Sequence, residues 1–274
     1  MMRKERLLAG IGSATSFHYS CFLRHVSCFL VREVIVIKKL LQLAEMAGNR
    51  AFLYRMLASL YLREVCVEQL KAMSELDMQG VMKDMGLDLS GEFYQHPVEQ
   101  VVEELAVEYC RLFIGPGIHF PPYESVYAGE FVAGGGIKGL LWGEAAVEVN
   151  RFIRECGLEF DASYRGLPDH LGVELDLMGQ LAAWEASAWS EGDAGDARMA
   201  VELQSRFMKD HLVKWVPDYC QQLAGAARVP FYREMSLLTK DFIMIDMERI
   251  EELLRLDLPE IKDKLSLAAE KSAI

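Results

Sequence analysis

The residues whose types and spacing could do chemistry are few. His170 and Glu174 are four positions apart, as are Glu92 and His96, so each pair would share one face of a helix. Metal sites in helical bundles, however, combine a Glu-x-x-His motif on each of two helices with glutamates from two more, and no Glu-x-x-His occurs in this sequence. The spacing therefore favours His170 as a polar residue at a helix start and Glu174 as a hydrogen-bond partner or a solvated charge.

Three glycines, Gly134, Gly136 and Gly139, satisfy the pattern G-x-G-x-x-G. A dinucleotide site of that type needs a preceding strand and a βαβ unit, and neither is evident around these residues. The Gly-Lys-Ser/Thr end of a phosphate-binding loop is also missing. We interpret the glycines as part of a flexible loop.

Nucleophilic chemistry finds no support either. There is no Gly-x-Ser-x-Gly motif, and Cys110, although near His119 in sequence, is expected in a helix core. The six cysteines are dispersed without a Cys-x-x-Cys pair, which indicates reduced thiols in the cytoplasm: Cys21, Cys28, Cys66, Cys110, Cys156 and Cys220. We therefore predict no catalytic residue, no metal site and no cofactor, and a protein that is not an enzyme.

The elements that must position the remaining residues are predicted to be helices. The 274 residues are 51% hydrophobic and 26% charged, with only 8 prolines and no clear alternating apolar runs. Apolar spacing, proline and glycine predict helices at 50–62, 65–76, 78–85, 97–114, 140–157, from 168 to the turn at 191–196, at 196–224 and at 230–255, with a short one at 258–270. The fold class is therefore all-α.

The charge is unevenly placed along the chain. Residues 1–45 carry a net charge of +4, so that residues 46–274 carry −16 of the total of −12. Residues 1–45 are too polar for a signal peptide, and their apolar runs are too short or too interrupted to cross a bilayer. We expect them to be an upstream extension outside the core or an extra helix near 29–45, followed by helical parts at 46–160 and 161–274.

Between Ile118 and Gly139 the sequence predicts a long irregular stretch, which in a compact domain is usually functional or disordered. Its aromatic residues favour an ordered, packed loop. The paired prolines Pro121 and Pro122 stiffen the backbone before Tyr123 and Glu124, as suits a structural corner with a possible binding surface.

Four segments, in the same order, resemble the TorD/DmsD/NarJ-like family of redox-enzyme maturation chaperones. The first is Glu108-Tyr109-x-x-Leu112-Phe113-x-Gly115-Pro116 followed by Pro121-Pro122-Tyr123-Glu124-Ser125-Val126-Tyr127. The others begin at Trp142-Gly143-Glu144, at Leu167-Pro168-Asp169-His170-Leu171 and at Phe207-x-x-x-His211-Leu212-x-x-Trp215-x-Pro217. The resemblance covers about Arg50 to Phe242, and residues 1–45 have no counterpart.

The resemblance implies a helical bundle of two parts joined by a hinge near Pro168-Asp169-His170. It also implies a cytoplasmic chaperone that binds the twin-arginine leader or the apo form of a molybdopterin-dependent oxidoreductase and holds it for cofactor insertion before export. A NarJ-like chaperone for a non-exported subunit is the alternative, and a helical nucleotide- or metal-dependent enzyme a remote one. An acidic body complements leader arginines and disfavours nucleic acid.

Carried over residue by residue, the resemblance implies leader or client contact by Tyr123, Glu124, Asp169 and His170, with Trp142 and Glu174 in the second rank. The competing structural interpretation is that Asp169 caps a helix and Tyr123 fills the core. We expect no nucleic-acid partner and no stable membrane insertion; a monomer and a homodimer are both compatible with the sequence.

Overall fold

The computed structural model describes residues 14–75, 96–116, 119–127, 143–160 and 164–256, with side chains from Val36 onward. Its elements are α1 (Ala14–Leu62), α2 (Val67–Glu75), α4 (Val98–Tyr109), the π-helical turn η2 (Cys110–Ile114), α5 (Glu124–Tyr127), α6 (Glu144–Glu155), α7 (Leu171–Glu191), α8 (Ala194–Phe207), the π-helical turn η3 (Met208–Leu212), α9 (Val213–Ala226) and α10 (Pro230–Arg255). The described residues form no strand, only an isolated bridge between Tyr123 and His170. The prediction of an all-α fold is confirmed.

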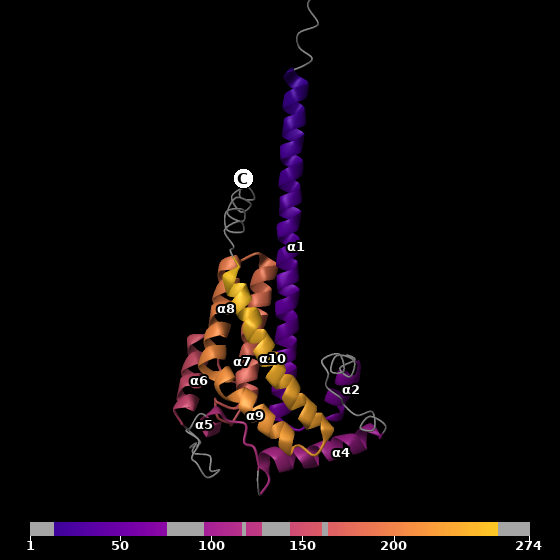
Figure 1. Cartoon of the computed structure of the whole chain (residues 1–274), viewed down its shortest axis with the longest axis vertical. Helices are drawn as coiled ribbons and strands as arrows, with labels where there is room; N and C mark the ends of the chain where they lie inside the picture. The colour runs from indigo at the N-terminus through magenta and orange to yellow at the C-terminus, as the bar shows by residue number, and fades with distance from the viewer. Residues whose placement is uncertain (1–13, 76–95, 117–118, 128–142, 161–163, 257–274) are drawn as a thin grey trace, which may run out of the picture.

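α7 is the central helix of the bundle. It packs along α1 and against α8, while α10 packs against α8 and α9 (Figure 1). Two glycines of α7 permit the close approach of α1. A Cβ atom at Gly172 would lie 2.4 Å from Cγ of Leu62, and one at Gly179 would lie 2.9 Å from Cγ of Arg55. The α1–α7 contact therefore depends on the absence of side chains at these two positions.

α1 runs through the boundary that the charge break predicts between residues 45 and 46. Its N-terminal part projects beyond the ends of the other helices (Figure 1). Leu40, Leu43 and Ala44 are nevertheless buried in the core, so the last turns of this segment pack against the bundle. The division at 160/161, the hinge, and an extension formed by the residues before Val36 stay predictions.

Most helices follow the sequence predictions. Those predicted at 65–76, 140–157 and 230–255 are confirmed as α2, α6 and α10. The helix predicted at 196–224 is α8 and α9, with the π-helical turn η3 between them. The helices predicted at 78–85 and 258–270 lie outside the described residues. None of the helices in the described ranges is long and apolar enough to span a membrane.

Hydrogen bonds hold the chain on both sides of η2, at Glu108 of α4 and at Phe120. The buried Glu108 carboxylate accepts hydrogen bonds from Arg111 Nη2 at 2.7 Å and from the backbone N–H of Arg228 at 2.6 Å, which ties α4 to the residues before α10. The N–H of Phe120 donates to the carbonyl of Leu112 at 2.7 Å. The chain is thereby directed from α4 towards the start of α7.

Candidate functional site

Two segments that are far apart in the sequence pair beside the start of α7. The N–H of Glu124 donates to the Asp169 carbonyl at 2.9 Å, and the N–H of Leu171 donates to the Pro122 carbonyl at 2.8 Å. The rings of Tyr123 and His170 meet edge to face with their centroids 5.0 Å apart. The fold thus brings together Tyr123, Glu124, Asp169 and His170, the four positions that the resemblance favours.

The Asp169 carboxylate does not cap α7. Its Oδ2 instead accepts a hydrogen bond from the backbone N–H of Ser125 at 3.0 Å, while its Oδ1 has no hydrogen-bond partner among the described residues. The N-cap of α7 is His170, whose Nδ1 accepts from the N–H of Gly172 at 3.0 Å. The expectation of a capping Asp169 is therefore wrong, because its side chain bonds the neighbouring segment rather than its own helix.

His170 is held in its neutral form. Burial lowers the pKa of its imidazole from about 6.5 to about 4. The unprotonated Nδ1 is also the atom that the capping hydrogen bond requires. The prediction of His170 as a polar residue at a helix start is confirmed.

Glu124 is joined to the late helices through a histidine. Its Oε2 lies 2.8 Å from Nδ1 of His211, and both side chains are buried. His211 belongs to η3, and its ring stacks on Phe207 with a centroid distance of 4.7 Å. Such π-helical turns inside helices are frequent at functional sites. The turn places the imidazole of His211 against the carboxylate of Glu124.

Glu174 lies behind Glu124 and is completely buried. Its Oε2 accepts a hydrogen bond from Nε1 of Trp215 at 3.2 Å. Burial is the main cause that raises the pKa of Glu174 well above its usual value. The neighbouring Glu124, through its charge and a hydrogen bond, and the charge of Asp169 raise it further. The hydrogen bond from Trp215 opposes this rise. The raised pKa favours the neutral form of the Glu174 carboxyl group next to Glu124.

We call Glu124, Asp169, Glu174 and His211 the acidic cluster. None of its carboxylates forms an ion pair with a Lys or Arg among the described residues; Glu124 pairs only with His211. A metal is not indicated there, since no group of three or more potential ligands in the described ranges could hold one. The cluster combines buried carboxylates with unused acceptor atoms, an arrangement that can attract a cationic group.

The predicted contact residues differ in accessibility. Tyr123 is partly exposed, whereas Glu124, Asp169 and Glu174 are 4%, 0% and 0% exposed. Trp142 lies outside the described residues. In this conformation a client could therefore touch the Tyr123 ring directly, but the carboxylates could act only through their field or after the covering segment moves.

His211 and Trp215 were assigned no role from the sequence, although both belong to the fourth matching segment. Their spacing of four places them on one face of a helix, which is the signal that could have indicated them. It could not indicate their partners Glu124 and Glu174, which are 87 and 41 residues away in the chain.

Comparison with known proteins finds sequence similarity across the segments that form this site. A family model described as "Nitrate reductase delta subunit" matches residues 91–221. Chaperone protein TorD of Vibrio vulnificus is 26% identical over 73% of this chain and 94% of its own length. Chaperone protein TorD of Photobacterium profundum is 27% identical over 72% of this chain and 92% of its own length.

A solved structure of a candidate redox enzyme maturation protein from Archaeoglobus fulgidus is 16% identical and covers 73% of this chain and 94% of that one. Its TM-score is 0.43, which is too low to support an argument about the fold. The sequence matches give the class of protein that the chain resembles: the nitrate reductase delta subunit family over residues 91–221, and chaperone proteins named TorD over about three quarters of the chain. Both of these relatives are named as chaperones.

Proposed function

We propose that the protein acts in the cytoplasm, where it binds the twin-arginine leader, the apo form, or both, of a molybdopterin-dependent oxidoreductase. It holds this client until the cofactor is inserted and export can follow. The observation that carries the proposal is the acidic cluster behind the partly exposed ring of Tyr123, with no Lys or Arg of the described residues to neutralise it. A twin-arginine leader supplies the missing cationic groups.

The charge and shape of the surroundings suit such a ligand. Residues 46–274 carry a net charge of −16, which favours encounter with a basic segment. Tyr123 offers an aromatic face on which a guanidinium or an apolar leader residue can pack. Asp169 Oδ1 and Glu174 Oε1 are buried acceptors without a hydrogen-bond partner among the described residues. An arginine that reached either oxygen would satisfy it.

We assign roles to five of the six predicted residues from their positions. Tyr123 and the edge of His170 would touch the leader first. Glu124 and Asp169 would supply the negative potential, and Glu174 would offer a buried acceptor behind them. Direct contact with these three residues requires residues 119–127 to move away from α7. Trp142 precedes α6 in the chain, and a contact role for it rests on the family resemblance alone.

Asp169→Asn tests the proposal because it removes the charge and keeps the oxygen that accepts from Ser125. A charge-assisted hydrogen bond contributes about 1.5–3 kcal/mol, so we expect affinity for a twin-arginine leader peptide to fall about tenfold or more. Isothermal titration calorimetry measures the affinity, and thermal melting checks that the fold is kept. A leader peptide with both arginines replaced by glutamine should bind wild type and variant equally.

Asp193→Asn is the matched control. Asp193 is the N-cap of α8, where its side chain accepts from the N–H of Asp196 at 2.8 Å. Asn caps about as well as Asp, so the control variant should bind the leader like wild type. If Asp169→Asn also binds the leader as tightly as wild type, the leader site lies elsewhere, and the aromatic residues of 120–131 are the next candidates.

The alternative client is a non-exported subunit without a leader, as for NarJ-like chaperones. The match of residues 91–221 to the nitrate reductase delta subunit family supports this alternative client. Calorimetry with a leader peptide and with a leaderless apo-subunit separates the two. Binding of the leader peptide alone supports the exported client, whereas binding of the leaderless subunit alone supports the alternative.

A further inference from the structure

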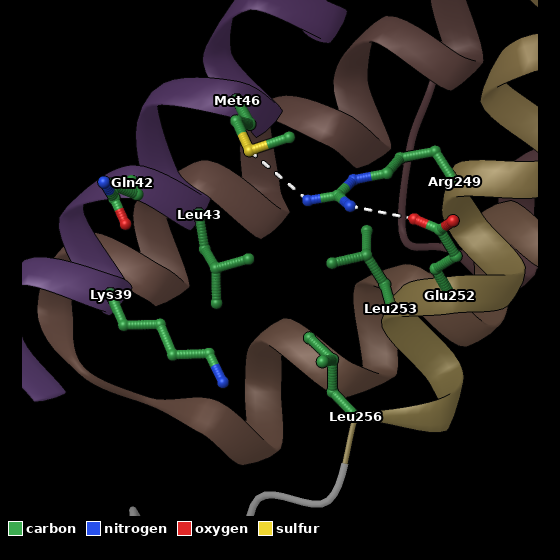
Figure 2. A pocket seen from close by; sticks show the side chains of 8 residues that line it. All are labelled: Lys39, Gln42, Leu43, Met46, Arg249, Glu252, Leu253 and Leu256. Atoms are coloured by element: carbon green, nitrogen blue, oxygen red, sulfur yellow. Dashed lines mark hydrogen bonds and ion pairs between the residues drawn. The ribbon is translucent and has the colours of Figure 1, made fainter.

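An open groove lies where α1 crosses the C-terminal end of α10, away from the acidic cluster. Its volume is about 420 Å³, within the range of roughly 300–1,000 Å³ typical of ligand pockets. Leu43, Leu253 and Leu256 give it an apolar floor, as Figure 2 shows. Met46 at the rim is 42% exposed, and Ile245, one turn before Arg249 on α10, is 59% exposed. Leu43 and Leu253 are themselves buried, so the exposed apolar surface at this place comes from Met46, Ile245 and the half-buried Leu256.

The rim of the groove is basic on balance. Lys39 stands at the end near Leu256, and no ion pair joins it to another described residue (Figure 2). Arg249 stands at the other end, where it pairs with Glu252 at 3.0 Å and donates to Met46 Sδ at 3.3 Å. A twin-arginine leader is repelled by such a rim, so the groove fits an apolar segment that begins with acidic residues.

We propose that the groove is the docking site of the chain's own C-terminal segment, residues 257–274. That segment starts directly after Leu256, which itself lines the groove. Leu258, Ile261 and Leu265 recur at helical spacing and give it one apolar face. Asp257 and Glu260 are the first charged residues of the segment, and they follow Leu256, at the end of the groove where Lys39 stands. A tethered segment also has a high effective concentration compared with any separate partner.

The residues at the end of α10 are compatible with a chain that turns back along the groove. Leu256 leaves the helix in an extended conformation, with φ −62° and ψ 120°, and Pro259 prevents α10 from continuing while suiting the first turn of a new helix. A connection of two to five residues is sufficient for an antiparallel helical hairpin. A helix at 259–271 would be about 20 Å long, and the groove from Leu256 back to Arg249 extends about 10 Å.

The docked segment would cover the solvent side of the α1–α10 contact. Met46 and Arg249 lie about one turn from Arg50 and Asp246, which form a buried ion pair between the two helices. The segment would thus seal that buried charge pair from water as well as bury apolar surface.

Cross-linking of the full chain tests the contact. With a zero-length carbodiimide reagent and mass spectrometry, we expect Glu260 to link to Lys39 and Lys264 to Glu252. Mixing ¹⁴N- and ¹⁵N-labelled protein identifies links between two copies. Links within one chain support the proposal, whereas links found only between differently labelled chains overturn it in favour of a second copy as the occupant.

Thermal melting gives the second measurement. The double variant Ile261→Asn/Leu265→Asn removes the apolar face, and the control Lys262→Asn changes a neighbouring polar residue. We expect the double variant to melt roughly 2–4 °C lower and the control to melt like wild type. Equal melting temperatures for the double variant and the control would overturn the proposal.

Discussion

Two buried polar networks in this molecule are built on opposite principles. In the first, Arg50 of α1 is surrounded by acceptors: its Nη1 lies 2.7 Å from Glu185 Oε2 and its Nη2 3.0 Å from Asp246 Oδ2, while Nε also bonds Asp246. Gln204 and Tyr54 bond the same groups, with Gln204 Nε2 2.9 Å from Glu185 Oε2 and the Tyr54 hydroxyl 2.6 Å from Asp246 Oδ2. One cation and its acceptors thus tie α1, α7, α8 and α10 together.

The acidic cluster has no such cation. Glu124 and Asp169 meet Glu174 and His211 at the start of α7, and two carboxylate oxygens have no hydrogen-bond partner among the described residues. Unpaired buried acceptors cost free energy, so natural proteins keep few of them. Among the described residues, the satisfied Arg50 network joins four helices, whereas the unsatisfied cluster lies beside a partly exposed aromatic residue. The difference indicates that the first network serves the fold and that the second is available for a ligand.

The largest expected effect is the loss of the cation in the Arg50 network. Arg50→Met leaves Glu185 and Asp246 buried without a counter-charge, which should lower the free energy of unfolding by about 3–5 kcal/mol. Urea denaturation measures this. The control is Arg55→Met on the same helix, an exposed residue that should change stability by less than about 0.5 kcal/mol. A loss below about 1 kcal/mol for Arg50→Met would remove the contrast between the networks.

A smaller effect is expected from pH at His170, the N-cap of α7, which follows Asp169 of the acidic cluster. Because burial lowers the pKa of His170 to about 4, its contribution to stability is complete above about pH 6.5 and is lost as pH falls towards 4. That loss amounts to about 3 kcal/mol. The comparison is with His170→Asn, which keeps a capping side chain but cannot take up a proton.

Urea denaturation at several pH values between 4 and 7 gives the difference between wild type and His170→Asn. We expect this difference to shift in favour of the variant as the pH falls. The unfolded wild type takes up a proton on His170 at a higher pH than the folded protein does, and the variant has no imidazole there to protonate. Parallel curves over the whole range would show that His170 does not titrate with a lowered pKa.

The sequence predicts the helices well and the networks poorly, for a physical reason. Apolar spacing, Pro97, Pro230 and Gly115 act locally, so α4 and α10 follow from the residues within them. Arg50 meets Asp246 across 196 residues, and no local pattern encodes such a pairing. For residues 1–45 the sequence left two alternatives, an extension outside the core and an extra helix near 29–45. α1 agrees with the helical alternative but continues without a break through Met46, which the charge break did not indicate.

The smallest expected effect comes from replacing one buried glutamate in each network by glutamine. The two replacements should change the free energy of unfolding in opposite directions. Burial and the charge of Glu124 raise the pKa of Glu174, so Glu174→Gln replaces a carboxyl group that favours its neutral form by an amide of nearly the same shape. Its oxygen can still accept from Trp215, and its N–H₂ can donate to Glu124. A raised pKa makes wild type lose stability as pH rises through that pKa, so the variant should gain on the order of 1 kcal/mol over wild type at alkaline pH and nothing near pH 4.

The matched change Glu185→Gln weakens the contact with Arg50 and should destabilise by about 1.5–3 kcal/mol. Because both variants turn a buried glutamate of α7 into glutamine, opposite signs in urea denaturation at pH 8 would confirm that only the Arg50 network stabilises its glutamate by an ion pair. A loss of stability in both variants at that pH would mean that Glu174 is ionised, and the acidic cluster would then need a cation that the described residues do not provide.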